Sequence, residues 1–165
     1  MKLVDSKREL AARVAGQAEL RDIQVFKLHA ELTEHPAPGV ALDYNLDTDA
    51  RCVTPDESNA LIVEVSYDLV IRQPLTQGSE SDDESELEHK EVARVELLLA
   101  ALFDLPAHPD GRPYIEEEFR AFADTSGQFA LYPYARQSIT DLTTRLALPP
   151  LVLGMLKLNL DPDDE

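Results

Sequence analysis

The residue types that most often perform chemistry are present in this chain, but they lack the spacing that chemistry needs. Four histidines (His29, His35, His89 and His108) lie in different segments, and none forms the H-x-x-x-H or H-E-x-x-H pair that places two metal ligands on one helix face. The six glycines form neither a P-loop nor a dinucleotide-binding fingerprint. We therefore expect no metal, no nucleotide or other cofactor, and no enzymatic activity.

The candidate nucleophiles are equally isolated. Cys52 is the single cysteine, so an intrachain disulfide and a cysteine-based zinc cluster are excluded. Ser138 and Thr140 have no glycine elbow beside them. The first residues become charged before a signal-peptide core can form, and no later stretch is apolar enough to span a bilayer. We expect a cytoplasmic protein that is not inserted into a membrane.

The charge balance limits the class of partner. With 32 acidic against 15 basic residues, the formal net charge is -17. Such a field repels phosphates and therefore argues against nucleic acid and anionic membrane surfaces. It attracts basic polypeptides, although a charge of this size also serves solubility alone. Both interpretations stay open on charge alone.

Three segments at the beginning of the chain have clear periodicity. Apolar residues at three- and four-residue spacing predict a helix over 6–17, with Ser6 and Glu9 forming a capping box. The alternating segment 18–32 changes parity twice, which predicts a long strand interrupted by a bulge. A second strand, over 40–47, has one apolar and one polar face.

Two further strands and an acidic segment follow. Residues 61–72 alternate most regularly and predict a half-buried strand, and residues 92–103 predict another that is apolar on both faces near its end. Between them, the segment 79–91 carries seven acidic residues and predicts a solvated hairpin loop. A second acidic segment forms the tail at 159–165.

Helices are predicted in the last third of the chain. Three glutamates at 116–118 suit the first turn of a helix over 115–123, which we expect Gly127 to terminate. A second helix is expected over 129–146, with Pro133 tolerated near its first turn. The apolar run 151–158 is too short for an independent helix and must be covered. Four strands followed by helices predict one α+β domain over 1–165, a four-stranded antiparallel sheet with helices on one face.

One region of the sequence resembles a known family. The run Leu131-Tyr132-Pro133-Tyr134-Ala135-Arg136, followed by a helix and then Leu148-Pro149-Pro150-Leu151-Val152-Leu153, resembles the signature region of SecB chaperones. The pieces Leu20-Arg21-Asp22-Ile23 and Ala101-Leu102-Phe103-Asp104 are most similar to SecB-like chaperones of actinobacterial toxin–antitoxin systems.

This resemblance implies a function and an assembly. It implies an ATP-independent holdase that binds unfolded or nascent polypeptides, here controlling an antitoxin, and a homotetramer built as a dimer of dimers. The residues expected at the interface between dimers lie on the second helix: Leu131, Tyr134, Ile139, Leu142 and Leu146. The residues expected to bind clients form an apolar strip: Phe26, Leu28, Val40, Leu42, Tyr44, Leu46, Leu151, Leu153, Met155 and Leu156.

Two alternatives remain. A general export chaperone would deliver preproteins to the Sec translocase ATPase, and Glu31 and Glu96 are the acidic residues that correspond to the family's docking positions. Lys27, Arg94 and Gln137 depart from that pattern, so only part of the docking surface survives. The second alternative is an acidic oligomeric adaptor that binds one folded partner.

Overall fold

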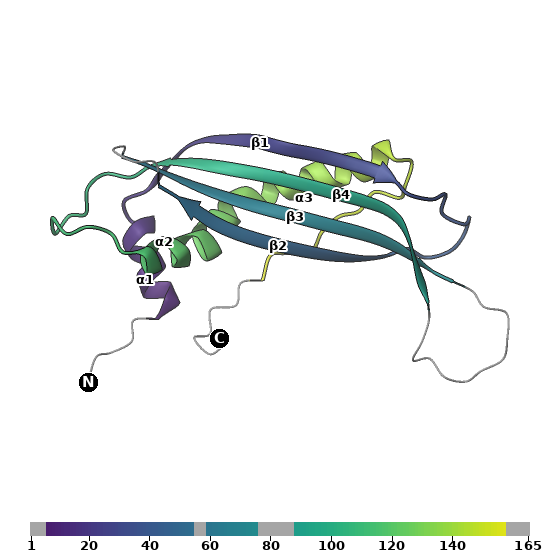
Figure 1. Cartoon of the computed structure of the whole chain (residues 1–165), viewed down its shortest axis with the longest axis horizontal. Coiled ribbons are helices and arrows are strands. Elements are labelled where there is room, and N and C mark those ends of the chain that lie inside the picture. The colour runs from purple at the N-terminus through teal and green to yellow at the C-terminus, as the bar shows by residue number, and fades with distance from the viewer. Residues whose placement is uncertain (1–5, 55–58, 76–87, 158–165) are drawn as a thin grey trace.

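The computed structural model describes residues 6–54, 59–75 and 88–157 (Figure 1). Four antiparallel strands form one sheet in the order β1-β4-β3-β2. This arrangement confirms the predicted antiparallel sheet. The elements in chain order are α1 (Lys7–Ala15), β1 (Glu19–Leu32), β2 (Asp43–Val53), β3 (Ala60–Pro74), β4 (His89–Asp104), α2 (Glu116–Phe122), the π-helical turn η1 (Ala123–Gly127) and α3 (Gln128–Arg145).

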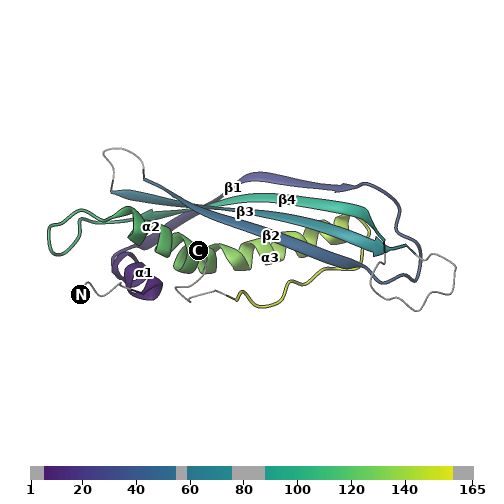
Figure 2. The ribbon, with the colours of Figure 1, turned by 60° about the horizontal axis from the view of Figure 1, so that its bottom comes forward.

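The helices lie on one face of the sheet, and the core lies between the two layers (Figure 2). In β3, the alternate residues from Leu61 to Ile71 point toward the helices and are at most 4% exposed. Leu131, Ala135 and Ile139 of α3 cover them at helical spacing and are fully buried. The other face of the sheet has no helix on it among the described residues, and we call it the open face.

The irregularity predicted for the first strand is confirmed. The pairing of β1 with β4 shifts register between Leu20 and Asp22, and again between Val25 and Lys27. Each shift inserts one unpaired residue and re-aims the side chains that follow, which is why the apolar parity of this segment changes twice. Phe26 is the extra residue at the second shift, and its side chain is largely exposed.

The chain does not leave the helical conformation between α2 and α3. Gly127 has helical backbone angles and joins η1 to α3, so the expected termination at this glycine is wrong. A Cβ atom here would lie 2.6 Å from Cγ1 of Val63 on β3. Because Gly127 has no side chain, the helix can pack closely against the sheet at this position. Pro133 also lies inside α3 rather than at its start, and the carbonyl that it leaves without a donor belongs to the exposed Phe129.

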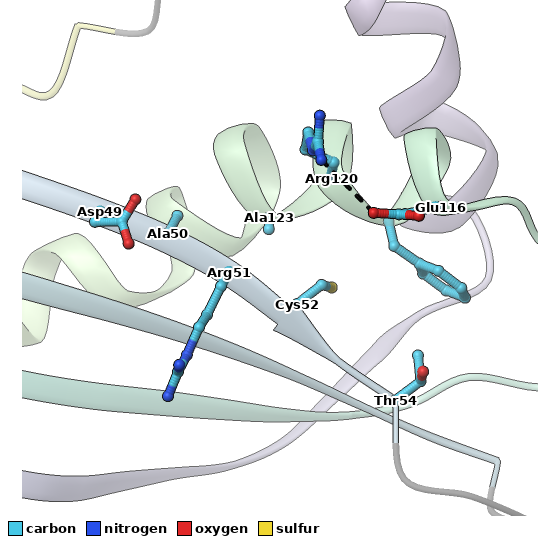
Figure 3. A pocket seen from close by; sticks show the side chains of 9 residues that line it. Asp49, Ala50, Arg51, Cys52, Thr54, Glu116, Arg120 and Ala123 are labelled. Carbon is cyan, nitrogen blue, oxygen red and sulfur yellow. Dashed lines mark ion pairs between the residues drawn. The ribbon is translucent and has the colours of Figure 1, made fainter.

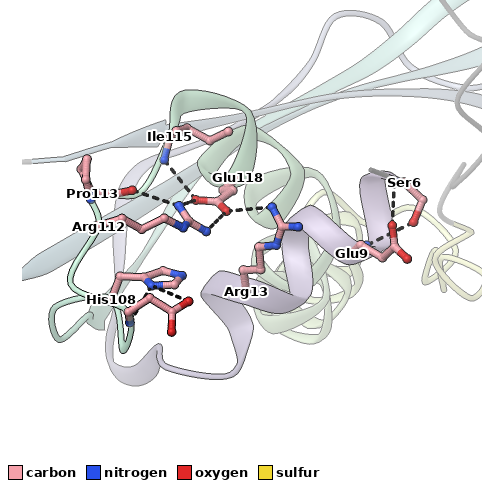
Figure 4. Close-up of polar contacts among 9 residues, drawn as sticks. Ser6, Glu9, Arg13, His108, Arg112, Pro113, Ile115 and Glu118 are labelled. Carbon is pink, nitrogen blue, oxygen red and sulfur yellow. Dashed lines mark hydrogen bonds and ion pairs between the residues drawn. The ribbon is translucent and has the colours of Figure 1, made fainter. Parts of the chain in front are cut away.

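Buried polar contacts join the helices at one end of the sheet (Figure 4). The Glu118 side chain of α2 is fully buried and accepts hydrogen bonds from Arg112, from Arg13 of α1 and from the Ile115 N–H. The Arg112 contacts measure 2.5 and 3.0 Å and those from Arg13 and Ile115 3.3 and 3.1 Å. The bonds from Arg112, with those of the other donors, lower the pKa of Glu118 to about 2.

The ends of three expected segments need correction, and the largest change is in the second strand, which spans Asp43–Val53 rather than 40–47. The predicted helix at 6–17 spans Lys7–Ala15, and its capping box is present because Ser6 and Glu9 exchange hydrogen bonds. His89 already pairs with Pro74, so residues 89–91 of the expected acidic loop are strand. Residues 79–87 of that loop and the acidic tail at 159–165 lie outside the described residues. No helix in the described ranges has the length and apolarity to cross a membrane.

The residues after α3 fold back along that helix (Figure 2). Ala147 has a positive φ of 58°, which reverses the chain, and the N–H of Leu148 donates to Thr143. Beyond the prolines, the Leu151 N–H donates to Oγ1 of Thr143, and Thr140 donates to the Leu151 carbonyl. Tyr132 donates to the Gly154 carbonyl at 2.5 Å. The apolar run after α3 is thus covered in part by its own subunit, and we call residues 148–157 the returning segment.

Candidate client-binding site

An apolar cavity of about 240 Å³ lies between the beginning of β2 and the returning segment. We call it the first cavity. It contains four of the expected client-binding residues, although these come from two segments about a hundred positions apart. The lining residues are Val40, Ala41, Leu42, Asp43, Tyr44, Ile71, Leu148, Pro149, Pro150 and Leu151.

Strand β2 leaves this cavity open because it is an edge strand. Its pairing with β3 sets Tyr44 opposite Ile71 and Leu46 opposite Leu69, so these side chains face the helical layer. Leu46 is half-buried, whereas Tyr44 remains 44% exposed. Among the described residues, no strand pairs with the outer edge of β2. An extended peptide can therefore reach both backbone groups and apolar side chains here.

Four of the expected client-binding residues lie on the returning segment, and they differ in how far they are exposed. Leu153 is 1% exposed and belongs to the subunit's own core, so it has no surface to offer a client. Leu151 and Leu156 are half-buried, and Met155 is 87% exposed. Some side chains of this segment therefore pack against the subunit, whereas others face outward.

Phe26 and Leu28 lie far from the first cavity within one subunit. They are on β1, and the sheet order places β4 and β3 between β1 and β2. The single apolar strip that we expected is therefore two separate surfaces, one at each edge of the sheet. Sequence reasoning missed several members of these surfaces. Leu20 and Val25 on β1 and Val152 in the returning segment are 48–59% exposed, although the alternation on β1 already marked the first two.

The residues expected between dimers also separate into two groups. Leu131 and Ile139 are fully buried beneath the sheet of their own chain and have no surface for a second subunit. Tyr134 points outward and is 52% exposed. Leu142 and Leu146 are half-buried against the core. The outer side of α3 therefore offers less apolar surface to a second subunit, and is more polar, than we expected.

Glu31 and Glu96 lie on neighbouring strands of the open face, on adjacent cross-strand pairs. Nζ of Lys27 contacts Oε2 of Glu96 at 2.8 Å, and this bond lowers the pKa of Glu96. Glu31 is paired in register with Arg94 and lies 3.5 Å from His29. Basic neighbours therefore accompany both acids.

Among the described residues, neither the candidate metal ligands nor the single thiol forms a reactive group. The described residues contain no group of three or more histidine, cysteine or acidic side chains that could hold a metal. Burial raises the pKa of the Cys52 thiol to about 12, which keeps it protonated and unreactive near neutral pH. Exposed apolar surfaces of this kind indicate a binding site for another polypeptide.

Comparison with known proteins agrees with this geometry. No family model matches the sequence. The SecB-like chaperone Rv1957 of Mycobacterium tuberculosis strain H37Rv is 36% identical over 150 residues, which cover 90% of this chain and 83% of the relative. The SecB-like chaperone MT2006 of strain CDC 1551 matches to the same extent. This chain belongs to the SecB-like chaperone family.

A solved structure supports the same assignment for the fold of this SecB-like chaperone. The structure of Mycobacterium tuberculosis Rv1957 in complex with a ChAD peptide from the Rv1956 HigA1 antitoxin superposes with a TM-score of 0.74. The match covers 91% of this chain and 98% of the other, at 36% identity. The expected resemblance is thereby confirmed.

Proposed function

We propose that this SecB-like chaperone holds extended segments of unfolded polypeptides without ATP, and that an antitoxin segment is its principal client. The observation that carries the proposal is the first cavity beside the unpaired edge of β2, in a chain whose structural relative was solved with an antitoxin peptide. An edge strand and an apolar cavity together suit a peptide in extended conformation.

The expected energetics favour capture of loose chains over recognition of one folded surface. Each leucine-sized client side chain buried in the first cavity contributes about 1.5 to 3 kcal/mol before ordering costs. Several such contacts hold a client without demanding one sequence. Because no nucleotide-binding motif occurs, release follows mass action when a competing process consumes the free client.

We further propose a dimer of dimers as the working form. The exposed apolar side chains of β1, the outward-facing Tyr134, and the half-buried Leu142 and Leu146 further along the chain support this assembly. Pairing of the β1 edges or contact through α3 would cover surface that one subunit leaves open. The first cavity of each subunit would stay accessible because β2 is at the opposite edge of the sheet from β1.

The test is suppression of aggregation by stoichiometric protein in the absence of ATP. Tyr44→Ser should weaken the suppression severalfold, because it removes an apolar wall of the first cavity. Val53→Ser is the matched control: it lies on the same strand, is 40% exposed against 44% for Tyr44, and faces the open side. We expect Val53→Ser to retain wild-type activity.

Two results would contradict the proposal. If the wild-type protein fails to delay aggregation of several unfolded proteins, including an antitoxin, the holdase function is excluded. If it binds one folded partner that unfolded chains cannot displace, the adaptor alternative is correct.

A further inference from the structure

One wall of the first cavity has no helix or strand of its own to hold it in place. Residues 149–157 of the returning segment belong to neither kind of element, yet the first three of them line the cavity. We infer that Thr140 and Thr143 of α3 are positioning residues for client binding, because their hydroxyl groups fix this wall through the backbone of Leu151. The inference rests on the proposed function.

Leu151 has both of its backbone polar groups bound by these two side chains. Its N–H donates to Oγ1 of Thr143 at 3.1 Å, and its carbonyl accepts from Oγ1 of Thr140 at 2.8 Å. The Leu151 side chain is half-buried and lines the first cavity. Because a backbone group left without a partner inside a protein is costly, the two hydroxyls determine where this part of the segment lies.

Thr143 accepts the bond from Leu151 in a fully buried position. Its hydroxyl hydrogen is directed to carbonyls of its own helix, 2.9 Å from that of Ile139 and 3.0 Å from that of Thr140. The lone pairs of the hydroxyl oxygen remain for the Leu151 N–H. The helix carbonyls have backbone donors of their own. Removal of the hydroxyl therefore leaves the Leu151 N–H as the group without a partner.

A third hydroxyl of α3 holds the segment further along. Tyr132 lies on the same side of the helix, and its hydroxyl donates to the Gly154 carbonyl at 2.5 Å. Leu153, between the two attachment points, is 1% exposed and packs in the core. The stretch 151–154 is thus attached at both ends by side chains of α3. The cavity wall is therefore preformed, which lowers the ordering cost of a client that binds there.

A second cavity at the other end of β2 provides an internal comparison. It has a volume of about 600 Å³ and opens between the last half of β2 and the helical layer of α2 and η1 (Figure 3). Of the described residues that line it, all except Thr54 belong to these elements. Its shape therefore does not depend on Thr140 or Thr143. Cys52, the single cysteine, is half-buried in its lining and makes this cavity accessible to measurement.

The experiment measures binding of a labelled leucine-rich peptide of about seven residues by fluorescence anisotropy. Thr143→Val keeps the shape of the side chain but removes the hydroxyl, and should weaken binding about five- to tenfold. Thr143→Ser retains the hydroxyl and should bind within about twofold of the wild type. Thr144→Val is the matched control. Thr144 is exposed and its hydroxyl donates to a carbonyl of its own helix, so this variant should bind like the wild type.

Two further measurements distinguish positioning of the wall from a general loss of stability. In hydrogen exchange without peptide, the Leu151 amide of Thr143→Val should exchange about tenfold faster than that of the wild type. The rate at which a maleimide modifies Cys52 should stay unchanged, because the second cavity keeps its walls. A variant that merely loosens the whole fold would accelerate both reactions.

Thr140→Val tests the same wall if Thr143→Val disturbs folding. Thr140 is half-buried, and this variant removes the donor to the Leu151 carbonyl, so it should weaken peptide binding severalfold. Wild-type affinity in both valine variants, or binding by Thr143→Ser as weak as by Thr143→Val, would overturn the inference. Faster modification of Cys52 in parallel with the loss of affinity would also overturn it. If the wild-type protein binds no peptide and suppresses no aggregation, the proposed function itself fails, so the two failures are distinguishable.

Discussion

Glu118 is the residue on which the helical end of the molecule depends. It is a fully buried carboxylate bound by two arginines and one backbone N–H. Replacing it with glutamine removes the charge that compensates those arginines. We expect Glu118→Gln to destabilise the protein by about 1 to 3 kcal/mol, less than for a fully buried pair because both arginine side chains are partly exposed.

Urea unfolding measures this loss, and α2 supplies the control. Glu116 pairs with Arg120 on the same helix, but both side chains are solvent-exposed. Glu116→Gln should therefore change the free energy of unfolding by no more than about 0.5 kcal/mol. Equal effects of the two substitutions would show that burial of Glu118 does not stabilise the fold.

The lowered pKa of Glu118 also predicts a pH dependence. The ionised carboxylate is favoured in the folded state, where its pKa is about 2, against an ordinary value of 4.5. Its contribution to stability is complete above about pH 4.5 and is lost as the pH falls toward 2. The difference in unfolding free energy between wild type and Glu118→Gln should therefore shrink over this window. A difference that stays constant from pH 6 to pH 3 would contradict the assignment.

The sequence alone could not single out Glu118 from its neighbours. Glu116, Glu117 and Glu118 occupy equivalent positions for a helix dipole, so all three are expected in the first turn. Only the tertiary fold brings Arg13 to Glu118 from 105 residues away. The same limit applies to the candidate client-binding site. The alternation of 40–46 identified its strand side, whereas Pro149 and Pro150 became cavity walls only because the chain reverses at Ala147.

At the scale of the elements, Gly127 sets the distance between the helical layer and the sheet. An alanine inside a helix is ordinarily about 1 kcal/mol more favourable than glycine. Here the added Cβ would lie 2.6 Å from Val63, so we expect Gly127→Ala to destabilise the protein by about 1 to 3 kcal/mol. Urea unfolding of the single variant checks the sign of this effect.

A double-mutant cycle assigns the cause. Val63→Ala removes the Cγ atoms that the new Cβ would meet, so adding Gly127→Ala to Val63→Ala should be much less harmful than adding it to the wild type. Additive effects would mean that the close approach of η1 to β3 is not what requires glycine.

The elements with strong local signals could be predicted, and those that depend on tertiary packing could not. The alternation of β3 and the capping box of α1 are properties of a few neighbouring residues, and both are present. The parity changes in β1 likewise report the bulges directly. At Gly127, by contrast, the local pattern led to a wrong prediction. A glycine after an amphipathic run usually ends a helix, but close packing on Val63 is a reason that no local pattern reveals.

At the scale of the whole molecule, the two edge strands present different surfaces. β1 exposes Val25, Phe26 and Leu28, each more than half exposed, at one edge of the sheet. The first cavity lies along β2 at the other edge. In the proposed assembly, a subunit that associated through β1 and α3 would therefore keep its proposed client site free, as a holdase requires.

This separation predicts that assembly and client binding can be disrupted independently. Tyr134 is 52% exposed on the outer side of α3, and an aspartate there would place a charge in an apolar contact between subunits. Native mass spectrometry of the wild-type protein should give a tetramer of about 74 kDa from the 18.4 kDa chain. Tyr134→Asp should reduce it to dimers, while Ile115→Asp, a comparably exposed control at the beginning of α2, should not. The dimers should still suppress aggregation of an unfolded client because the first cavity lies on β2. A monomeric wild-type protein, or loss of that suppression together with the tetramer, would contradict this division between the two edges.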